Sequence, residues 1–280
     1  MNFLIALIAI ILLEAYGELS FVQRDGWLRK WHKALSVLDT SGRSSLMALA
    51  LLIGAPVLVL HLVFSALAQQ NMGLINFLLE LLILLYALGR GNLDTQIALF
   101  TSDLQGDDLQ AAFHDAAVFN TAYREGRAET AEDLKAEVFT ALPYRIFERS
   151  FVVIFWFFFF GAPAALAYRL LALHGDLGLD SKDRQAIKWL WLMEWLPVRF
   201  LGLTVGLVGN FSQAAGSTRQ LIFSRSIGTG VFLRQAIKGA LGESDSSGPL
   251  NPLTINAVVS LFGRAMTAWL VIIAILVILS

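Results

Sequence analysis

Cysteine is absent from the 280 residues, which excludes disulfides, thiolate zinc sites and cysteine nucleophiles. Histidine is scarce as well, with four scattered residues and no His-Glu-x-x-His cluster, so we expect neither a metal site nor a cofactor. The phosphate-binding loop G-x-x-x-x-G-K-[ST] and the nucleophile elbow G-x-S-x-G are also missing. The sequence therefore identifies no catalytic residue.

Charged residues are also few. Charged residues make up 15% of the chain, against roughly 25% in an ordinary globular domain. The formal net charge is −1, so no basic field is available for nucleic acid. Hydrophobic residues make up 56%, and the mean hydropathy is +0.64. These values predict an integral membrane protein in contact with membrane lipids.

The longest apolar run, "SFVVIFWFFFFGAPAALAY", fills the interval between Arg149 and Arg169. A helix of that length spans about 28 Å, close to the ~30 Å hydrocarbon core of a bilayer. Gly161 and Pro163 interrupt it, and a proline inside a helix removes a hydrogen bond and bends the axis. We expect the bend to face the protein interior, beside a cavity bounded by residues 161–169, Glu80 and Arg199.

Hydrophobicity predicts an all-α polytopic membrane protein with about five or six transmembrane helices. The candidate spans are residues 2–17, 46–68, 74–92, 150–170, 187–209 and 257–279. The second and third are separated by "QQNMG", which predicts a tight antiparallel hairpin. Because no basic residue precedes "FLIALIAIILL" and no cleavage site follows it, we expect an uncleaved first helix. Basic residues in the loops before residue 46 and after residue 90 place those loops in the cytoplasm.

We interpret residues 1–280 as one membrane domain that contains a soluble helical insertion, 93–146. Helical spacing predicts one helix over 107–123 and a second after "GRAET", where Thr130 and Asp133 form a capping-box pattern. Pro143 is expected to end the second helix. Residues 211–256 are expected to form an interfacial amphipathic helix followed by a flexible loop.

Ionisable residues at membrane depth usually face the protein interior or water, because each costs about 2.5–3.5 kcal/mol at a helix centre. We expect Arg199 to pair with Glu80 or Glu14; the alternative is that these groups are structural, or reach the membrane surface. The ionisable residues that fall within the predicted spans are Glu14, His61, Glu80, Glu194 and Arg199.

Two further patterns leave alternatives open. Gly202-x-x-x-Gly206 lets helices approach closely, either inside the chain or across a homodimer. Arginines near a membrane boundary suit a phosphate or carboxylate ligand, or ordinary headgroup anchoring. Such polar groups fall on two segments, Asn120 with Tyr123 and Arg124, and Arg145 with Glu148 and Arg149.

The apolar run also carries a resemblance. The pattern "FW", four residues, then Gly161-x-Pro163-x-Ala165-Leu166-x-Tyr168-Arg169 resembles the fourth-helix signature of the AmpE family, and the length and order of spans are similar to it. Remote relatives are the CobD/CbiB adenosylcobinamide-phosphate synthases. Here "LLALHG" follows Tyr168-Arg169 in place of the synthases' Asn, Thr and Asp run, and the early Gly-Asp-Pro and Pro-His-Pro motifs are absent. These departures favour the AmpE branch.

The resemblance implies a multi-pass protein of the bacterial inner membrane, a signalling or accessory component in muropeptide recycling, β-lactamase induction and the response to antibiotic. It also implies a functional link to a cytosolic anhydro-muropeptide amidase. The alternative is a membrane-bound ligase or transferase with a CobD/CbiB-like site and an altered substrate; a small-solute carrier is disfavoured because we find no inverted repeat. The candidate ligand-binding residues are Glu80, Arg199, Glu148, Arg149, Tyr168, Arg169, Asn120 and Arg124.

Overall fold

The computed structural model describes residues 2–16, 22–38, 45–89, 93–106, 108–116, 119, 130–176, 184–242 and 252–279. Every regular element in these ranges is a helix, which confirms the all-α prediction for the described part of the chain. The chain folds into two compact units that alternate along the sequence. Unit 1 contains Met1–Gly91 and Val152–Met193, and unit 2 contains Asn92–Phe151 and Glu194–Ser280.

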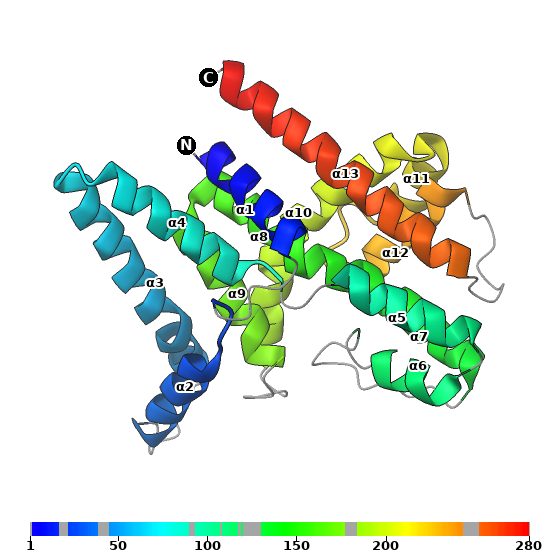
Figure 1. Cartoon of the computed structure of the whole chain (residues 1–280), viewed down its shortest axis with the longest axis horizontal. Coiled ribbons are helices and arrows are strands. Elements are labelled where there is room, and N and C mark those ends of the chain that lie inside the picture. Colours follow the sequence, from blue (N-terminus) through cyan, green and yellow to red (C-terminus); the bar gives the residue numbers. More distant parts are fainter. Residues whose placement is uncertain are drawn as a thin grey trace. The chain divides into compact units, whose positions relative to one another are not determined.

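Unit 1 is built from six helices and the beginning of a seventh (Figure 1). They are α1 (Asn2–Tyr16), α2 (Gly26–Leu38), α3 (Ser45–Gln69), α4 (Gly73–Ala87), α8 (Val152–Phe160), α9 (Ala162–Asp176) and the first part of α10 (Arg184–Val208). The α3–α4 hairpin confirms the prediction from "QQNMG". Its turn places Asn71 at φ 54°, a left-handed conformation that asparagine tolerates better than most residues.

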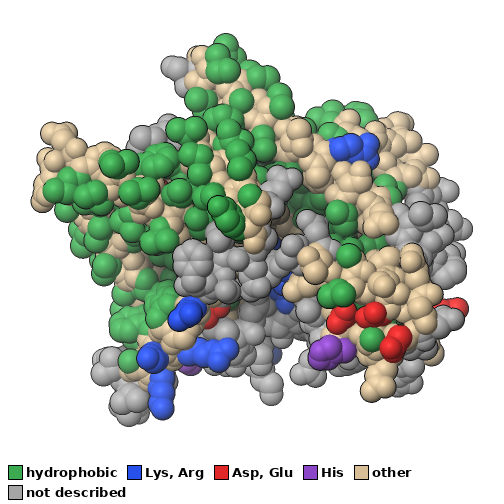
Figure 2. Space-filling model, in the orientation of Figure 1, with side chains coloured by type: hydrophobic (Ala, Val, Ile, Leu, Met, Phe, Trp, Pro, Cys, Tyr) green, Lys and Arg blue, Asp and Glu red, His purple; other side chains and the backbone are tan. Residues whose placement is uncertain are grey.

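The core of unit 1 lies where α9 packs against α3 and α4. Leu28 of α2, Leu52 of α3 and Leu170 of α9 are almost completely buried in it. Helix α2 was not predicted, although its sequence is strongly amphipathic. Its apolar side meets this core, while Lys and Arg side chains gather over its outer side and hydrophobic side chains cover α3 and α4 (Figure 2).

Three helices of the described residues are long and apolar enough to cross a membrane. They are Leu46–Gln69 of α3, Arg184–Val208 of α10 and Ile255–Leu279 of α13. Several apolar side chains on α3 are exposed, for example Leu58 and Val59, which are 59% and 60% exposed. Runs of exposed apolar residues on long helices are typical of lipid contact, so the chain is a membrane protein. The predicted count of five or six spans is not reached by this criterion, because α1 and α4 are shorter.

The interruption in the long apolar run is a true helix break. Helix α8 ends at Phe160, and Gly161 takes φ +77°, a left-handed conformation that costs glycine little. The Gly161 N–H still bonds to the Phe157 carbonyl at 2.8 Å. Pro163 follows in the first turn of α9, where its missing N–H leaves no bond unmade. The predicted bend is therefore confirmed, and the glycine rather than the proline makes it.

Unit 2 holds the predicted soluble insertion and the C-terminal helices. Its elements are α5 (Leu93–Gln105), α6 (Leu109–Ala116), α7 (Ala131–Ile146), a π-helical turn (Phe147–Phe151), the rest of α10, α11 (Phe211–Thr218), α12 (Thr229–Leu241) and α13 (Pro252–Leu279). Helices α6 and α7 correspond to the two predicted ones, and α5 was missed. The N-cap of α7 is as predicted: the Thr130 hydroxyl accepts from the Asp133 N–H at 3.1 Å.

Pro143 does not end α7, so that prediction is wrong. The helix passes through Pro143 and continues into the π turn. Proline removes only one donor, and the Phe147 N–H still bonds to the carbonyls of Pro143 and Tyr144. The chain therefore stays helical from Ala131 to Phe160.

The segment after α10 is a helical hairpin instead of a single interfacial helix. Helix α12 fits the predicted amphipathic helix, but α11 was missed and the two pack closely together. A Cβ at Gly239 of α12 would lie 2.5 Å from the Ala214 Cα of α11, so only glycine allows this approach. The predicted flexible loop falls largely on residues 243–251, outside the described residues.

The glycine pattern of α10 is used within the chain. A Cβ at Gly202 would meet the Phe232 ring of α12 at 2.6 Å, and one at Gly206 would meet the Ala214 Cβ of α11 at 3.2 Å. This is the internal alternative of the two predicted for Gly202-x-x-x-Gly206. A homodimer through the same face would have to displace α11 and α12.

Candidate ligand site at the π turn

The π turn interrupts the long helix shortly before the apolar run. A π turn inserts one extra residue into a helix, and such insertions are frequent at functional sites. Here the sequence is Phe147-Glu-Arg-Ser-Phe151, which combines two aromatic rings with two charges and a hydroxyl. The Ser150 hydroxyl donates to the Ile146 carbonyl at 2.6 Å. The polar residues of this segment thereby gather on one short stretch of backbone.

The centre of the cluster is an ion pair between Arg145 and Glu148. Arg145 Nη1 lies 3.0 Å from Glu148 Oε2, and the two side chains are only 9% and 4% exposed. A buried pair is costly to desolvate and is weak evidence for stability, but removing one partner leaves an uncompensated charge. The pair therefore fixes the local arrangement around it.

A second buried carboxylate joins the same stretch of helix. The Tyr144 hydroxyl donates to Glu194 Oε1 of α10 at 2.7 Å. Glu194 is 2% exposed. The prediction that it faces the interior is confirmed; the alternative of an exposed interfacial residue is not.

Arg149 is the accessible cation of the cluster. It is half-buried, and its Nη1 donates to the Gln96 side-chain oxygen of α5 at 3.3 Å. A guanidinium is planar and carries five donors, a geometry that suits a carboxylate or phosphate. The site residues predicted at Glu148 and Arg149 thus lie together in unit 2.

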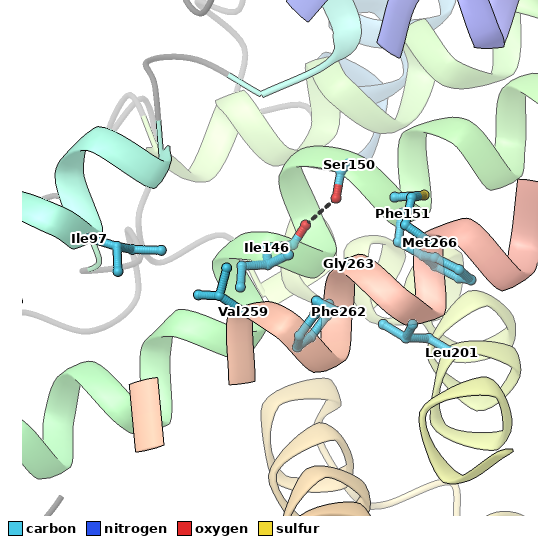
Figure 3. Close-up of a pocket in the computed structure, with 9 residues that line it drawn as sticks. All are labelled: Ile97, Ile146, Ser150, Phe151, Leu201, Val259, Phe262, Gly263 and Met266. Atoms are coloured by element: carbon cyan, nitrogen blue, oxygen red, sulfur yellow. Dashed lines mark hydrogen bonds between the residues drawn. The ribbon is translucent and has the colours of Figure 1, made fainter. Parts of the chain in front are cut away.

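An apolar groove of about 280 Å³ lies on the neighbouring faces of these helices in unit 2 (Figure 3). Its lining residues are Ile97, Ile146, Ser150, Phe151, Leu201, Val259, Phe262, Gly263 and Met266. A second cavity of similar volume lies in unit 1, between Leu49 of α3, Leu171 of α9 and Trp189 of α10. Neither cavity is lined by Glu80 or Arg199, so neither is the cavity predicted beside the helix break.

Arg199 serves a structural purpose. Its guanidinium donates to the main-chain oxygens of Trp195, Ile222 and Ser224 at 2.9–3.1 Å. It also lies 4.5 Å from the Trp195 ring centroid and 5.0 Å from that of Phe232. These contacts hold the tip of the α11–α12 hairpin against α10. Among the described residues its hydrogen bonds go to backbone carbonyls of α10 and of the hairpin turn and not to the predicted carboxylate.

Glu80 finds its partner one helical turn away in unit 1. Asn76 Nδ2 donates to Glu80 Oε1 at 2.9 Å, and Glu80 Oε2 is buried with no hydrogen-bond partner among the described residues. Glu14, the alternative partner for Arg199, has a side chain outside the described residues, and His61 is exposed on α3.

Tyr168 and Arg169 belong to a different polar cluster, inside unit 1. Both are almost completely buried. The positive charge of Arg169 interacts electrostatically with the Tyr86 hydroxyl of α4. That hydroxyl donates to Asp25 at 3.1 Å and accepts from the Trp27 indole at 3.1 Å. Asp25 and Trp27 were not predicted from the sequence. Their signal is a polar and an aromatic residue on either side of Gly26, where the amphipathic helix α2 begins.

The remaining candidates, Asn120 and Arg124, lie outside the described residues, as does Tyr123. No group of three or more His, Asp or Glu that could hold a metal ion occurs among the residues searched. The described structure thus brings Glu148 and Arg149 together in unit 2, and Tyr168 and Arg169 in unit 1.

Comparisons with known proteins found no similarity: no protein-family model, curated protein or solved structure matches this chain. The fold and site therefore define a helical membrane protein with buried charged clusters. Its family and function are matters for proposal.

Proposed function

We propose that this chain is a multi-pass protein of the bacterial inner membrane, similar to the AmpE family, that acts as a signalling or accessory component in muropeptide recycling and β-lactamase induction. It binds a small anionic ligand at the π turn. The functional link to a cytosolic anhydro-muropeptide amidase is part of the same proposal.

One observation supports the proposal above the others. The π turn lies at the start of the 148–169 segment that carries the AmpE resemblance, and it contains Glu148 and Arg149. Helical irregularity, buried charge and the family-like motif thus coincide in one stretch of chain. A helix needed only to cross a bilayer has no use for this combination, because each buried charge costs stability.

The chemistry of the cluster favours a carboxylate-bearing ligand. Arg149 is half-buried, and one of its hydrogen bonds goes to the neutral side chain of Gln96. The buried Arg145–Glu148 ion pair directly precedes it in the chain. A carboxylate or phosphate on Arg149 would gain a charge-assisted pair of hydrogen bonds. Muropeptides carry carboxylates, which agrees with the proposed role.

The physiological test is β-lactamase induction in a bacterium that lacks its own copy of the chain and expresses variants of it. Replacing Arg149 by Gln should reduce ligand affinity roughly tenfold or more, since one charged contact contributes about 1.5–3 kcal/mol. We therefore expect β-lactamase induction by a β-lactam to differ between the Arg149→Gln strain and the wild-type strain. Arg219→Gln, an exposed arginine of the hairpin turn, is the matched control and should behave as wild type.

Unchanged induction in the strain that lacks the chain would contradict the signalling role. Native mass spectrometry of the purified protein then separates the ligand classes. A retained muropeptide fragment supports the sensor, and its loss in Arg149→Gln places it at the π turn. A retained nucleotide that is consumed on incubation would instead support the alternative ligase or transferase, for which Glu148 and Glu194 are the buried carboxylates at hand.

A further inference from the structure

One arginine inside a candidate span has no partner among the described residues. Arg264 lies within Ile255–Leu279 of α13 and is exposed. It forms no hydrogen bond or ion pair with any residue that the structure describes. An unpaired arginine is expensive at membrane depth, so it calls for water or an anion beside it. The sequence analysis did not single out this residue.

Arg264 directly follows Gly263, which lines the apolar groove. On α13 the exposed positions Ser260, Gly263, Arg264 and Thr267 follow helical spacing and therefore form one open stripe. Gly263 belongs both to that stripe and to the groove lining, so the groove opens on the side where Arg264 is exposed. A Cβ at Gly263 would meet nothing within 4 Å. The mouth is thus open beside a cation.

The interior of the groove is suited to a hydrocarbon chain. Val259, Phe262 and Met266 of α13 face Leu201 of α10 and the π-turn side chains across it (Figure 3). The one hydroxyl in the lining, that of Ser150, already donates to a backbone carbonyl. No polar side chain of the lining is left to orient a polar ligand, so its affinity is for apolar groups.

We propose that the groove and Arg264 together bind one anionic membrane phospholipid, with an acyl chain in the groove and the phosphate at Arg264. Two of the helices that line the groove, α10 and α13, are long and apolar enough to cross a bilayer, so lipid is the molecule expected on that side of it. Only a ligand that joins a negative charge to an apolar chain satisfies both the arginine and the lining. This site is separate from the π-turn ligand site at Arg149 and does not depend on the signalling role.

The test is native mass spectrometry of the full chain purified in detergent and incubated with phosphatidylglycerol or phosphatidylcholine of identical acyl chains. Wild type should retain one phosphatidylglycerol at least fivefold more than phosphatidylcholine. Gly263→Leu should lose retention of both, because its side chain fills the mouth. Gly216→Leu is the matched control: it is a helical glycine of the same unit with nothing within 4 Å of its Cβ, and it should retain lipid as wild type does.

Arg264→Gln separates the two halves of the site. It should lose the preference for phosphatidylglycerol while still retaining lipid, and Arg264→Lys should restore the preference. Equal retention by Gly263→Leu and wild type would overturn the proposal, as would an unchanged preference in Arg264→Gln. Retention of a polyprenyl phosphate in place of phosphatidylglycerol would also contradict it, because the occupant would then not be a bulk phospholipid. Melting temperatures equal to wild type show that each variant is folded.

Discussion

The α11–α12 hairpin and the open stripe of α13 place the same kinds of residue in opposite situations. At the hairpin, Arg199 of α10 has three carbonyl partners and two aromatic rings, and Gly239 of α12 has the Ala214 backbone close against it. On α13, Arg264 has no partner among the described residues, and Gly263 faces open space. Both arginines lie inside candidate spans.

The contrast shows that residue type alone does not identify a site. A charge whose hydrogen bonds are satisfied by its own chain is part of the packing, and its replacement disturbs the fold. A charge left open beside an apolar groove has no structural reason to be there, so a ligand is the better explanation. The two regions should therefore respond in opposite ways to the same substitutions.

The largest effect is expected at Arg199. Arg199→Ala removes three charge-assisted hydrogen bonds to partly buried carbonyls of α10 and the hairpin turn, at a cost of about 3 kcal/mol or more. The melting temperature in detergent should fall by several degrees. Arg264→Ala is the comparison, and it should leave the melting temperature unchanged. Equal destabilisation by both variants would remove the distinction between the two regions.

The glycines should give the next largest effect. Gly239→Val places methyl groups against the backbone of Ala214 and should destabilise the protein by about 2 kcal/mol through overpacking. Gly263→Val has room and should be neutral or slightly stabilising, because valine has a better helix propensity than glycine. Thermal unfolding of the two variants side by side measures this. If Gly239→Val were as stable as wild type, the hairpin would not be as closely packed as described.

A smaller effect is expected at the buried carboxylate of α10. Tyr144→Phe removes the hydroxyl that donates to Glu194 and should cost about 1–2 kcal/mol, since a buried acceptor loses a donor. Tyr16→Phe, at an exposed tyrosine of α1, is the control. Chemical denaturation compares the two, and a Tyr144→Phe variant as stable as its control would mean that Glu194 is satisfied without this bond.

The smallest effect concerns pH. Burial, together with the neighbouring carboxylates of Asp115 and Asp108, raises the pKa of Asp103 on α5 above its ordinary value. Because the folded protein then holds this proton more tightly than the unfolded chain, the α5–α6 pair should be less stable above the raised pKa. Its stability should increase as the pH falls through that pKa. Hydrogen exchange of α5 and α6 from pH 7 to pH 4 measures this change, and Asp115→Asn should reduce it.

Hydrophobic periodicity predicted the helices whose formation depends on residues close together in the sequence. The long apolar runs, the α3–α4 hairpin and the Thr130 cap could be predicted because each depends on residues close together in sequence. Helices α2, α5 and α11 were missed because they are short and mixed in composition, and they become helical by packing on neighbours. Tertiary contact overrides a weak local signal in such segments.

The site was predicted only in part, and for a related reason. A charged residue in an apolar run indicates that a partner exists, but the sequence does not show which group it is. Arg199 was expected to meet a carboxylate and instead meets carbonyls of a turn that only the hairpin creates. Asp25 and Tyr86 lie 61 positions apart, and no local pattern joins them. Glu148 and Arg149 could be predicted because their polar neighbours lie within one helical turn.

The most direct test of the account is whether lipid or water surrounds Gly263. Because the chain has no cysteine, a single Gly263→Cys substitution allows a nitroxide spin label to be attached at that position alone. In anionic lipid vesicles we predict that membrane-soluble oxygen relaxes the label more strongly than a water-soluble nickel complex, while Lys30→Cys on exposed α2 shows the reverse. Stronger relaxation of the Gly263 label by nickel would contradict the account, because that face would then lie in water.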